Sequence, residues 1–366
     1  MKKIVFVTPQ IKTGGGNRVF FELANILVKE YDVKIVYPNN SLENNTFSID
    51  QRIKFKAIGK FESNKIGKII NIASTFLYLN KYEKKAHIVT SDPIMSIFGF
   101  LLLGKLKYRF VQADDYNIFN DGMIIPNKLL LNLYKKLTKF SFKFNYSFIF
   151  NSNYSYRKFC EQNLTYKKDV KIVHPAINHF FFNSLNRPSL EKDKIQLCLV
   201  ARKHPLKGLQ TFIDSWKYMP AIIKEKVGKV VLISHDDLIG FDTSEFTIIR
   251  PNSDHDIVKE YLNADIFIST SWSEGFGLPP LEAMACGCAV ITSDSGGVSE
   301  FAINNENCLM FLPGDYKSLQ LAIEQLINDK QKMNQFQING VETAKLFSWN
   351  SSAKKMIEIF NSSDNK

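Results

Sequence analysis

The stretch Ser271–Thr292, SWSEGFGLPPLEAMACGCAVIT, decides the fold that we expect for this chain. It places a glycine-rich loop and two carboxylates, Glu274 and Glu282, between two short apolar runs that are typical of buried parallel strands. The glycines let the backbone approach a ligand closely, and the Pro-Pro pair suits the first turn of a helix. The loop therefore ends on a helix N-terminus, which favours an anion, at the carboxyl end of a strand, where open α/β sheets bind ligands.

Length and composition indicate a globular protein of two domains, with 366 residues and 45% hydrophobic content. The five cysteines are odd in number and form no C-x-x-C pair. This argues against a disulfide framework or a zinc site and for a reducing compartment. The apolar run Ile4–Val7 is too short for a signal peptide, and the longest apolar stretch, Pro93–Gly104, is too short to span a bilayer. We therefore expect a cytoplasmic protein.

The charge of the chain is unevenly distributed. Residues 1–185 carry a net charge of +15, and residues 186–366 carry −4. A general lysine bias would affect both halves equally. Because basic surfaces attract anionic membranes or nucleic acid, we expect the first half to face an anionic partner.

Strand-like and helix-like runs alternate in the first half, which predicts a doubly wound parallel sheet. The predicted strands span 2–8, 33–37, 53–58, 88–90, 108–112, 148–151 and 170–173, and the predicted helices span 17–30, 66–82, 93–103, 126–145 and 153–162. In the helix at 126–145 the apolar side chains share one face, which we expect to pack inward and to leave the lysines exposed. That face consists of Leu130, Leu133, Leu137, Phe140 and Phe144.

The second half repeats this alternation after a segment rich in Asn, Pro and Ser. The predicted strands span 195–200, 229–233, 247–249, 266–269, 290–292 and 309–312, and the predicted helices span 208–218, 256–263, 319–328 and 347–360. We therefore expect a first domain at 1–178, a linker at 179–193, a second domain at 194–346, and a C-terminal helix at 347–366 that packs back toward the first domain.

Three consecutive glycines, Gly14, Gly15 and Gly16, join the first strand to the first helix. The loop lacks the G-x-G-x-x-G spacing, and the second strand ends in Tyr37-Pro38 instead of an acid, which argues against a nicotinamide cofactor. We expect the glycines to present N–H groups to a phosphate or a sugar.

Several motifs together resemble those of GT-B glycosyltransferases, in particular the retaining family 4. The segment SEGFGLPPLEAMACGCAVITSDSGG contains the signature of a Glu, seven residues and a second Glu, and Ala201–Gly208 (ARKHPLKG) resembles the Arg…Lys pair of that family. The resemblance implies a GT-B fold, in which two Rossmann-like doubly wound domains face a central cleft. The first domain would bind the acceptor and the second the nucleotide sugar, as in a hexosyltransferase.

The resemblance also implies a role for each matched residue. Glu274 would contact the hydroxyls of the donor sugar and Glu282 those of the ribose, since carboxylates accept hydrogen bonds from diols. Arg202 and Lys207 would stabilise the departing diphosphate. The nucleobase would lie near residues 250–253. Backbone N–H groups would hold sugar and phosphate oxygens at Gly275, Phe276, Gly277 and Leu278.

We predict neither a metal ion nor a cofactor besides the donor. Fixed cations and helix N-termini can stabilise a departing diphosphate in place of a metal. The one Asp-x-Asp, Asp254-His255-Asp256, precedes an amphipathic run, where Asp acts as a helix cap. His204 and His255 are expected to form local hydrogen bonds.

One position departs from the family pattern. Many family members carry a His where this chain has Gln112, within the segment Val111-Gln-Ala-Asp-Asp-Tyr116. This segment is similar to that of a rhamnosyltransferase-like polysaccharide subgroup. Asp114 or Asp115 would then position the donor sugar or the acceptor beside the catalytic Glu274. As an alternative, both carboxylates cap their loop, and the sequence leaves this choice open.

The sequence thus predicts a nucleotide-sugar-dependent glycosyltransferase of bacterial surface polysaccharide synthesis, for lipopolysaccharide or capsule. The family implies retention of configuration. We expect a glycan or lipid-linked oligosaccharide acceptor, an anionic membrane surface at the inner face of the cell membrane, and no nucleic acid. Two other functions stay open: a sugar-nucleotide epimerase on the same fold, and a non-catalytic carbohydrate-binding module.

Overall fold

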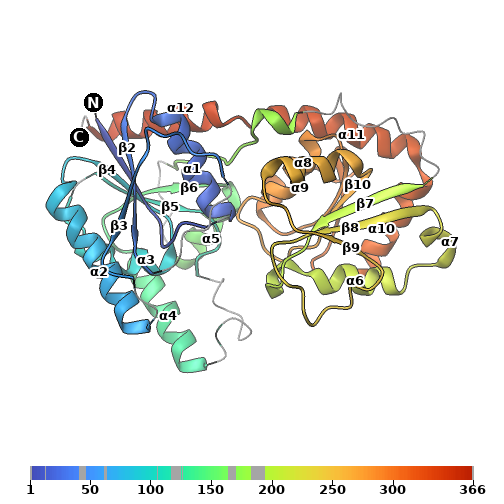
Figure 1. Ribbon diagram of the computed structural model, residues 1–366, viewed down its shortest axis with the longest axis horizontal. Helices are drawn as coiled ribbons and strands as arrows, with labels where there is room; N and C mark the ends of the chain where they lie inside the picture. Colours follow the sequence, from blue (N-terminus) through green and yellow to red (C-terminus); the bar gives the residue numbers. More distant parts are fainter. Residues whose placement is uncertain are drawn as a thin grey trace. The chain divides into compact units, whose positions relative to one another are not determined.

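The computed structural model describes residues 2–12, 14–40, 47–61, 64–104, 106–116, 125, 127–163, 170–182 and 194–364. The chain divides into two compact units, which we describe separately (Figure 1). The first unit consists of Met1–Pro175 and Trp349–Lys366, and the second of Ala176–Ser348. Of the segment predicted as a linker, 183–193 lie outside the described residues, whereas the short helix η3 (His179–Phe181) buries Phe181 in the second unit.

The first unit contains a parallel sheet of six strands in the order β3-β2-β1-β4-β5-β6. Its strands are β1 (Lys3–Val7), β2 (Asp32–Pro38), β3 (Lys54–Ile58), β4 (His87–Thr90), β5 (Lys107–Val111) and β6 (Ser147–Phe150). Its helices are α1 (Gly15–Leu27), α2 (Lys65–Tyr82), α3 (Pro93–Ile97), η1 (Phe98–Leu101), α4 (Lys128–Ser141), α5 (Asn153–Asn163) and α12 (Trp349–Asp364).

Both faces of this sheet are buried, which explains why its strands read as continuous apolar runs. Along β1 the side chains alternate between the faces. Phe6 contacts Phe20 of α1, with ring centroids 4.8 Å apart, whereas Val5 and Val7 belong to the core shared with α2 and α5. Helices therefore have to cover both sides, as in a doubly wound fold.

Helix α12 packs within the first unit, against α1 and the sheet. The ring of Phe360 lies 4.6 Å from His87 of β4 and 5.1 Å from Tyr108 of β5. Asp364 lies 3.3 Å from Nε2 of His87 and also pairs with Lys2 at 2.6 Å. Burial lowers the pKa of His87, although the carboxylate of Asp364 opposes this shift.

Helix α4 corrects the sequence-based expectation, because its apolar face is turned toward solvent. Its buried side chains are Leu131, Thr138 and Ser141. On the face that we expected to pack inward, Leu133 is 51% exposed and Phe140 is 55% exposed. Helical periodicity identifies an apolar face, but it does not reveal whether that face meets the core or another apolar phase.

The second unit contains another parallel sheet of six strands, in the order β12-β11-β10-β7-β8-β9. Its strands are β7 (Ile195–Val200), β8 (Val227–Ile233), β9 (Thr247–Ile249), β10 (Ile266–Ser269), β11 (Ala289–Ser293) and β12 (Cys308–Phe311). Its helices are η5 (Pro205–Lys207), α6 (Leu209–Lys217), α7 (Ala221–Lys224), α8 (Asp254–Asn263), α9 (Leu278–Ala285), η6 (Gly297–Glu300), α10 (Tyr316–Asn328) and α11 (Lys330–Lys345).

Several elements differ from the sequence-based assignment, among them α7 and the short helices η3, η5 and η6, which were not predicted. The expected strand at 170–173 is reduced to a single bridge between Phe150 and Ile172. Helix α11 was not predicted, because it buries only a narrow set of side chains among many polar residues. The five cysteines are all free and buried, as expected for small core residues. None of the helices formed by the described residues is both long and apolar enough to cross a bilayer.

A buried ion pair lies at the carboxyl end of β5. Arg109, which is fully buried, donates from Nη2 to Asp115 Oδ2 at 2.8 Å and from Nη1 to Ser141 Oγ of α4 at 2.7 Å. Burial raises the pKa of Asp115 to about 6, although the guanidinium opposes this shift. The pair therefore fixes the loop after β5 to the sheet and to α4.

We expect Asp115→Asn to lower the free energy of unfolding by about 3 to 5 kcal/mol, because it leaves the Arg109 charge buried without a carboxylate. Urea unfolding measures this loss. The double substitution Arg109→Met with Asp115→Leu should cost much less than Asp115→Asn, since it removes both charges. Full stability of Asp115→Asn would contradict a structural role of the pair.

We expect His87 to lower the stability of the first unit as the pH falls below about 6.5, the pKa of a histidine in an unfolded chain, whereas the raised pKa of Asp115 acts in the opposite direction. Because the pKa of His87 is lower in the folded state, the unfolded state binds more protons in this range, and acid favours unfolding. Between pH 7.5 and pH 5.5, the melting temperature of His87→Gln should fall less than that of the natural chain. An identical pH dependence would exclude His87 as the responsible group.

Candidate active site

The candidate site of the second unit lies at the carboxyl ends of β7 and β10. These two strands are neighbours at the point where the strand order reverses, since β7 continues to β8 and β9 on one side and β10 continues to β11 and β12 on the other. The loops that leave such a switch point diverge and create a binding crevice. The loop after β7 contains Arg202 and Lys207, and the loop after β10 contains Glu274.

Lys207 and Glu274 form an ion pair across the two loops. Nζ of Lys207 lies 2.7 Å from Oε1 of Glu274. The Lys207 side chain is 37% exposed and that of Glu274 is 17% exposed, so both groups remain reachable from solvent. The sequence-based prediction assigned both residues to one site, and the structure brings them into contact over 67 residues of chain.

Backbone contacts hold the two loops together. The N–H of Trp272 donates to the carbonyl of Leu206 at 2.7 Å, and the hydroxyl of Thr270 donates to the carbonyl of Lys207 at 3.0 Å. Gly208 has a φ of 62°, and a Cβ atom there would lie 2.1 Å from the Thr270 carbonyl oxygen. The tight approach therefore requires glycine and orients Lys207 before any ligand arrives.

The Glu274 loop is also held from the next strand. The N–H of Glu274 donates to Ser295, and the N–H of Gly297 donates to the carbonyl of Glu274, both at 2.8 Å. A Cβ atom on Gly297 would lie 2.2 Å from the carbonyl of Gly275, so only glycine fits. Gly277, with a φ of 92°, precedes α9 and has no side chain that could cap this helix. Pro279 and Pro280 carry no N–H, so Leu278 supplies the one backbone donor of the first three helical positions, which suits an anionic or hydroxyl oxygen.

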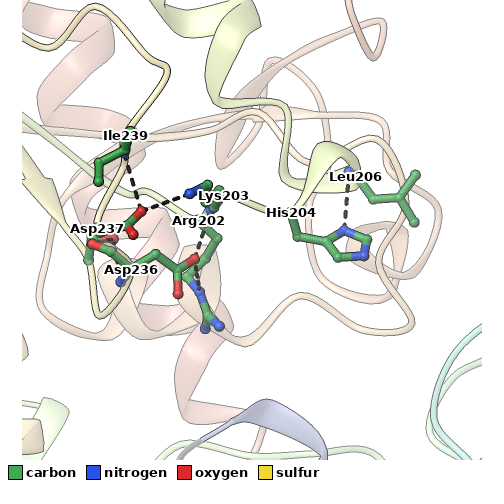
Figure 2. Close-up of polar contacts among 8 residues, drawn as sticks. Arg202, Lys203, His204, Leu206, Asp236, Asp237 and Ile239 are labelled. Atoms are coloured by element: carbon green, nitrogen blue, oxygen red, sulfur yellow. Dashed lines mark hydrogen bonds and ion pairs between the residues drawn. The ribbon is translucent and has the colours of Figure 1, made fainter. Parts of the chain in front are cut away.

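A second ion pair holds Arg202. Its Nε donates to Oδ2 of Asp236 at 3.0 Å, and the same oxygen accepts the N–H of Lys203 at 2.7 Å (Figure 2). Among the described residues nothing pairs with the two Nη groups of Arg202, so the guanidinium keeps donors for a ligand. Burial alone would raise the pKa of Asp236, but the Lys203 N–H and the Arg202 guanidinium lower it, and the carboxylate stays ionised.

Sequence reasoning missed the turn after β8 that carries Asp236 and Asp237. Lys203 pairs with Asp237 at 3.0 Å beside the Arg202 pair. The available signal was the polar run Ser234-His-Asp-Asp237 directly after a buried strand, at the same edge of the sheet as Arg202. The neighbouring His204 accepts the N–H of Leu206 through Nδ1, which confirms the local hydrogen bond expected of it (Figure 2).

Three further predicted residues of the second unit, Phe276, Leu278 and Glu282, are buried. The Phe276 ring packs against Phe301 and Phe347, with centroids 5.5 and 5.6 Å away, so only its backbone faces the loop's polar side. Leu278 begins α9 and is 8% exposed. Glu282, one turn further along α9, is 6% exposed. Arg250 is exposed beyond the end of β9.

The Asp254–Asp256 segment caps a helix. Ser253 is the N-cap of α8, and Asp256 accepts the N–H groups of Asn252 and Ser253 at 2.8 and 3.0 Å in a capping box. The capping role predicted for this segment is confirmed, with Ser253 instead of an aspartate at the N-cap position. Within the described part of the chain no group of three or more His, Cys, Asp or Glu side chains has the arrangement of a metal site.

The first unit has a pocket of about 260 Å³ at its own switch point, between β1 and β4. Gly14, Gly15 and Gly16 line it at the N-terminus of α1. Gln112, which stands where the family pattern has a His, donates to Ser91 Oγ at 2.7 Å and to the Gly16 carbonyl at 3.2 Å. It therefore joins three loops around the pocket.

Asp114 and Asp115 are both buried after β5. Asp115 lines the pocket and at the same time forms the ion pair with Arg109. Asp114 is 7% exposed and does not line this pocket. A carboxylate that lines a pocket and neutralises a buried guanidinium can orient a ligand hydroxyl only while that ion pair stays intact.

Comparisons with known proteins identify the kind of enzyme. The family described as Glycosyl transferases group 1 matches residues 243–343. The chain is similar to the N,N'-diacetylbacillosaminyl-diphospho-undecaprenol alpha-1,3-N-acetylgalactosaminyltransferase of Campylobacter jejuni subsp. jejuni serotype O:2. The two are 26% identical over 312 aligned residues, which make up 79% of this chain and 81% of that protein. The chain is also 26% identical to the serotype-specific mannosyltransferase WbdA of Escherichia coli over 172 aligned residues. These make up 44% of this chain and 21% of that protein.

Solved structures show the same fold. Sucrose-phosphate synthase from Thermosynechococcus elongatus superposes with a TM-score of 0.78 at 16% identity over 99% of both chains. WaaG, a glycosyltransferase involved in lipopolysaccharide biosynthesis, has a TM-score of 0.78 at 14% identity, over 98% of this chain and 99% of that one. The predicted GT-B fold is confirmed, the chain is a glycosyltransferase, and these similarities support the family-4-like kind.

Proposed function

We propose that this enzyme transfers a sugar from a nucleoside-diphosphate sugar to a glycan or lipid-linked glycan during bacterial surface polysaccharide synthesis. The bond between the anomeric carbon and the diphosphate breaks, the acceptor oxygen forms the new glycosidic bond, and the acceptor proton leaves with the diphosphate. Retention of configuration is the stereochemical outcome that the family resemblance implies. The configuration of the product, measured by NMR, tests it.

The observation that carries this proposal is the contact of Lys207 with Glu274 at the switch point of the second sheet. A transferase must bind an anionic diphosphate and a polyhydroxylated sugar side by side. Lysine offers a compact positive charge to phosphate oxygens, and a carboxylate accepts hydrogen bonds from sugar hydroxyls. In the free protein the two groups satisfy each other, and the donor would replace this contact with its own.

We propose that no metal is needed, because the chain supplies fixed positive charge at the leaving group. Arg202 keeps free donors for a bidentate contact with phosphate, and Lys207 adds a second cation. The N–H of Leu278, at the start of α9, adds a backbone donor on the same loop as Glu274. Transfer that persists in a strong chelator supports this proposal, and loss of transfer with recovery by a divalent ion contradicts it.

The acceptor is proposed from the relatives. The name of the Campylobacter enzyme specifies a sugar linked through a diphosphate to undecaprenol, and WbdA and WaaG are named for mannosyl transfer and lipopolysaccharide biosynthesis. A lipid-linked acceptor suits the basic first half of the chain, because an anionic bilayer attracts lysines. We therefore place the enzyme in the cytoplasm, at the inner face of the cell membrane.

Glu274→Ala and Arg202→Ala should each reduce transfer about 100-fold or more, since each removes a preorganised contact with the donor. The fold should survive, because neither side chain is part of an apolar core. A suitable assay measures sugar transfer together with the thermal shift caused by UDP-sugars. UDP is the first choice of nucleotide because HepE and TarM, which share this fold, were crystallised with it.

Lys203→Ala is the matched control, because Lys203 neighbours Arg202 but pairs with the half-exposed Asp237. It should retain transfer. Full activity of both Glu274→Ala and Arg202→Ala would refute the site. Formation of an epimerised nucleotide sugar without acceptor would favour an epimerase instead.

Asp236→Ala should raise the KM for the donor about tenfold, because Asp236 orients both the Arg202 guanidinium and the Lys203 backbone. Asp237→Ala removes a neighbouring carboxylate of the same turn and should leave the KM nearly unchanged, since its partner is the exposed Lys203. A lower KM in Asp236→Ala would mean that Asp236 competes with the diphosphate for Arg202 instead of positioning it.

A further inference from the structure

The first unit carries an apolar and basic surface that its core does not explain. The surface is formed by the exposed side chains of α2, η1 and α4, and we call it the α2–α4 face. Its apolar members are Ile66, Ile69, Ile70, Leu77, Phe100, Leu103, Leu129, Leu130, Leu133 and Phe140.

Helix α2 buries one side and exposes apolar side chains on the opposite side. Asn71, Thr75 and Leu79 follow each other at four-residue spacing and are buried. The opposite side carries Ile66, which is 72% exposed, and Ile70, which is 57% exposed. A soluble helix that covers a sheet needs apolar residues only on its buried side. The exposed apolar side of α2 therefore indicates another apolar partner.

Helix α4 shows the same arrangement more sharply. The small polar side chains of Thr138 and Ser141 face the core, whereas Leu129, at the first turn, is 83% exposed. Leu129, Leu133 and Phe140 recur at four- and seven-residue spacing and therefore share one side of the helix. The helix thus turns small polar side chains toward the core and exposes its large apolar side chains to solvent.

The three segments form one continuous surface. Helix η1 packs against both α2 and α4. Oδ1 of Asn80, at the end of α2, accepts the N–H of Leu103 at 2.9 Å. On the other side, Phe144 contacts Phe100 and Phe140, with ring centroids 6.3 and 5.2 Å away. The exposed apolar groups are therefore neighbours and not scattered positions.

The charge of this surface has a single sign. Helices α2 and α4 contain no Asp or Glu, and their lysines are Lys65, Lys68, Lys81, Lys128, Lys135, Lys136 and Lys139. Glu83, the carboxylate that follows α2, is buried and paired with Lys34. Lys84 and Lys85 extend the exposed positive charge beyond it. A protein partner would have to bring both apolar surface and a matching set of acids, whereas an anionic bilayer offers both together.

We propose that the α2–α4 face inserts its apolar side chains into the boundary between headgroups and acyl chains of an anionic membrane. The lysines around it contact the lipid phosphates, and their alkyl stems extend the apolar surface. This inference deepens the membrane location within the proposed function, on which it rests for its biological purpose. The inference attributes membrane binding to the insertion of the apolar side chains named above, and not to the positive charge of the first unit alone.

The test compares two triple variants in co-sedimentation with vesicles of phosphatidylcholine that contain phosphatidylglycerol. Leu129→Gln, Leu133→Gln and Phe140→Gln together should lower vesicle binding about tenfold or more. The matched control, Ile222→Gln, Leu321→Gln and Ile338→Gln, replaces three equally exposed apolar residues of the second unit and should bind like the natural chain. Vesicles of pure phosphatidylcholine should bind the natural chain much more weakly.

A second measurement reports insertion directly. Leu133→Cys can be labelled selectively with an environment-sensitive fluorophore, because the five natural cysteines are buried. Its emission should shift to the blue on anionic vesicles, whereas the same label on Ile338→Cys should not shift. Equal binding by the two triple variants, an unshifted emission at Leu133→Cys, or a concentration-dependent dimer that the first triple variant abolishes would each overturn the proposal.

Transfer to a water-soluble acceptor separates this inference from the proposed function. Both triple variants should retain it, since none of their residues belongs to the candidate active site. If the triple variant of α4 loses vesicle binding but keeps full transfer, this supports membrane insertion by the α2–α4 face. If the natural chain binds vesicles normally but transfers no sugar, the proposed function is refuted, whereas the inference of membrane insertion still stands.

Discussion

The ion pair between Lys207 and Glu274 is the contact on which the site of the second unit depends. Two parallel strands that are adjacent in the sheet, but separated by several elements in the chain, can present side chains to each other only through the loops at their carboxyl ends. The strands β7, β10 and β11 are largely buried in apolar cores and contain no charged residue. Polar chemistry is therefore confined to the loop edge. The glycines at 208, 277 and 297 allow the loops to approach closely enough for a cation and a carboxylate to touch.

The same edge in the first unit shows how burial changes what a carboxylate can do. Glu274 and Asp236 are partly exposed, and each holds a cation that keeps access to solvent. Asp115 occupies a comparable position after its strand, but its partner Arg109 is fully buried. An exposed pair can exchange its partner for a ligand at small cost, whereas separating a buried pair leaves an uncompensated charge. The second unit therefore offers exchangeable ion pairs, and the first unit offers a rigid one beside a glycine-lined pocket.

Much of the fold could be predicted from the sequence, because strands of a doubly wound sheet are continuous apolar runs between glycine-rich turns. Arg202, Lys207 and Glu274 could be assigned together because the motif spacing identifies both loops. Other features depend on tertiary contacts that no local pattern encodes. Asp236 can hold Arg202 only because β8 pairs with β7, which brings the turn after β8 next to the loop that contains Arg202. Likewise, the apolar side of α4 is visible in the sequence, but the polar contact of Ser141 with Arg109 determines which side of the helix faces the sheet.

The uneven charge of the chain does not explain how the donor is bound. A nucleotide sugar is an anion, yet the two cations assigned to it, Arg202 and Lys207, lie in the half with a net charge of −4, and not in the half with +15. Long-range attraction is screened within about 10 Å at ordinary salt concentrations, so the donor responds mainly to the cations next to it. Two cations held by neighbouring carboxylates are sufficient for such a local site. The excess positive charge of the first half, where α2 and α4 carry lysines without acids, is instead suited to an extended anionic surface, which is the reason for the membrane location proposed above.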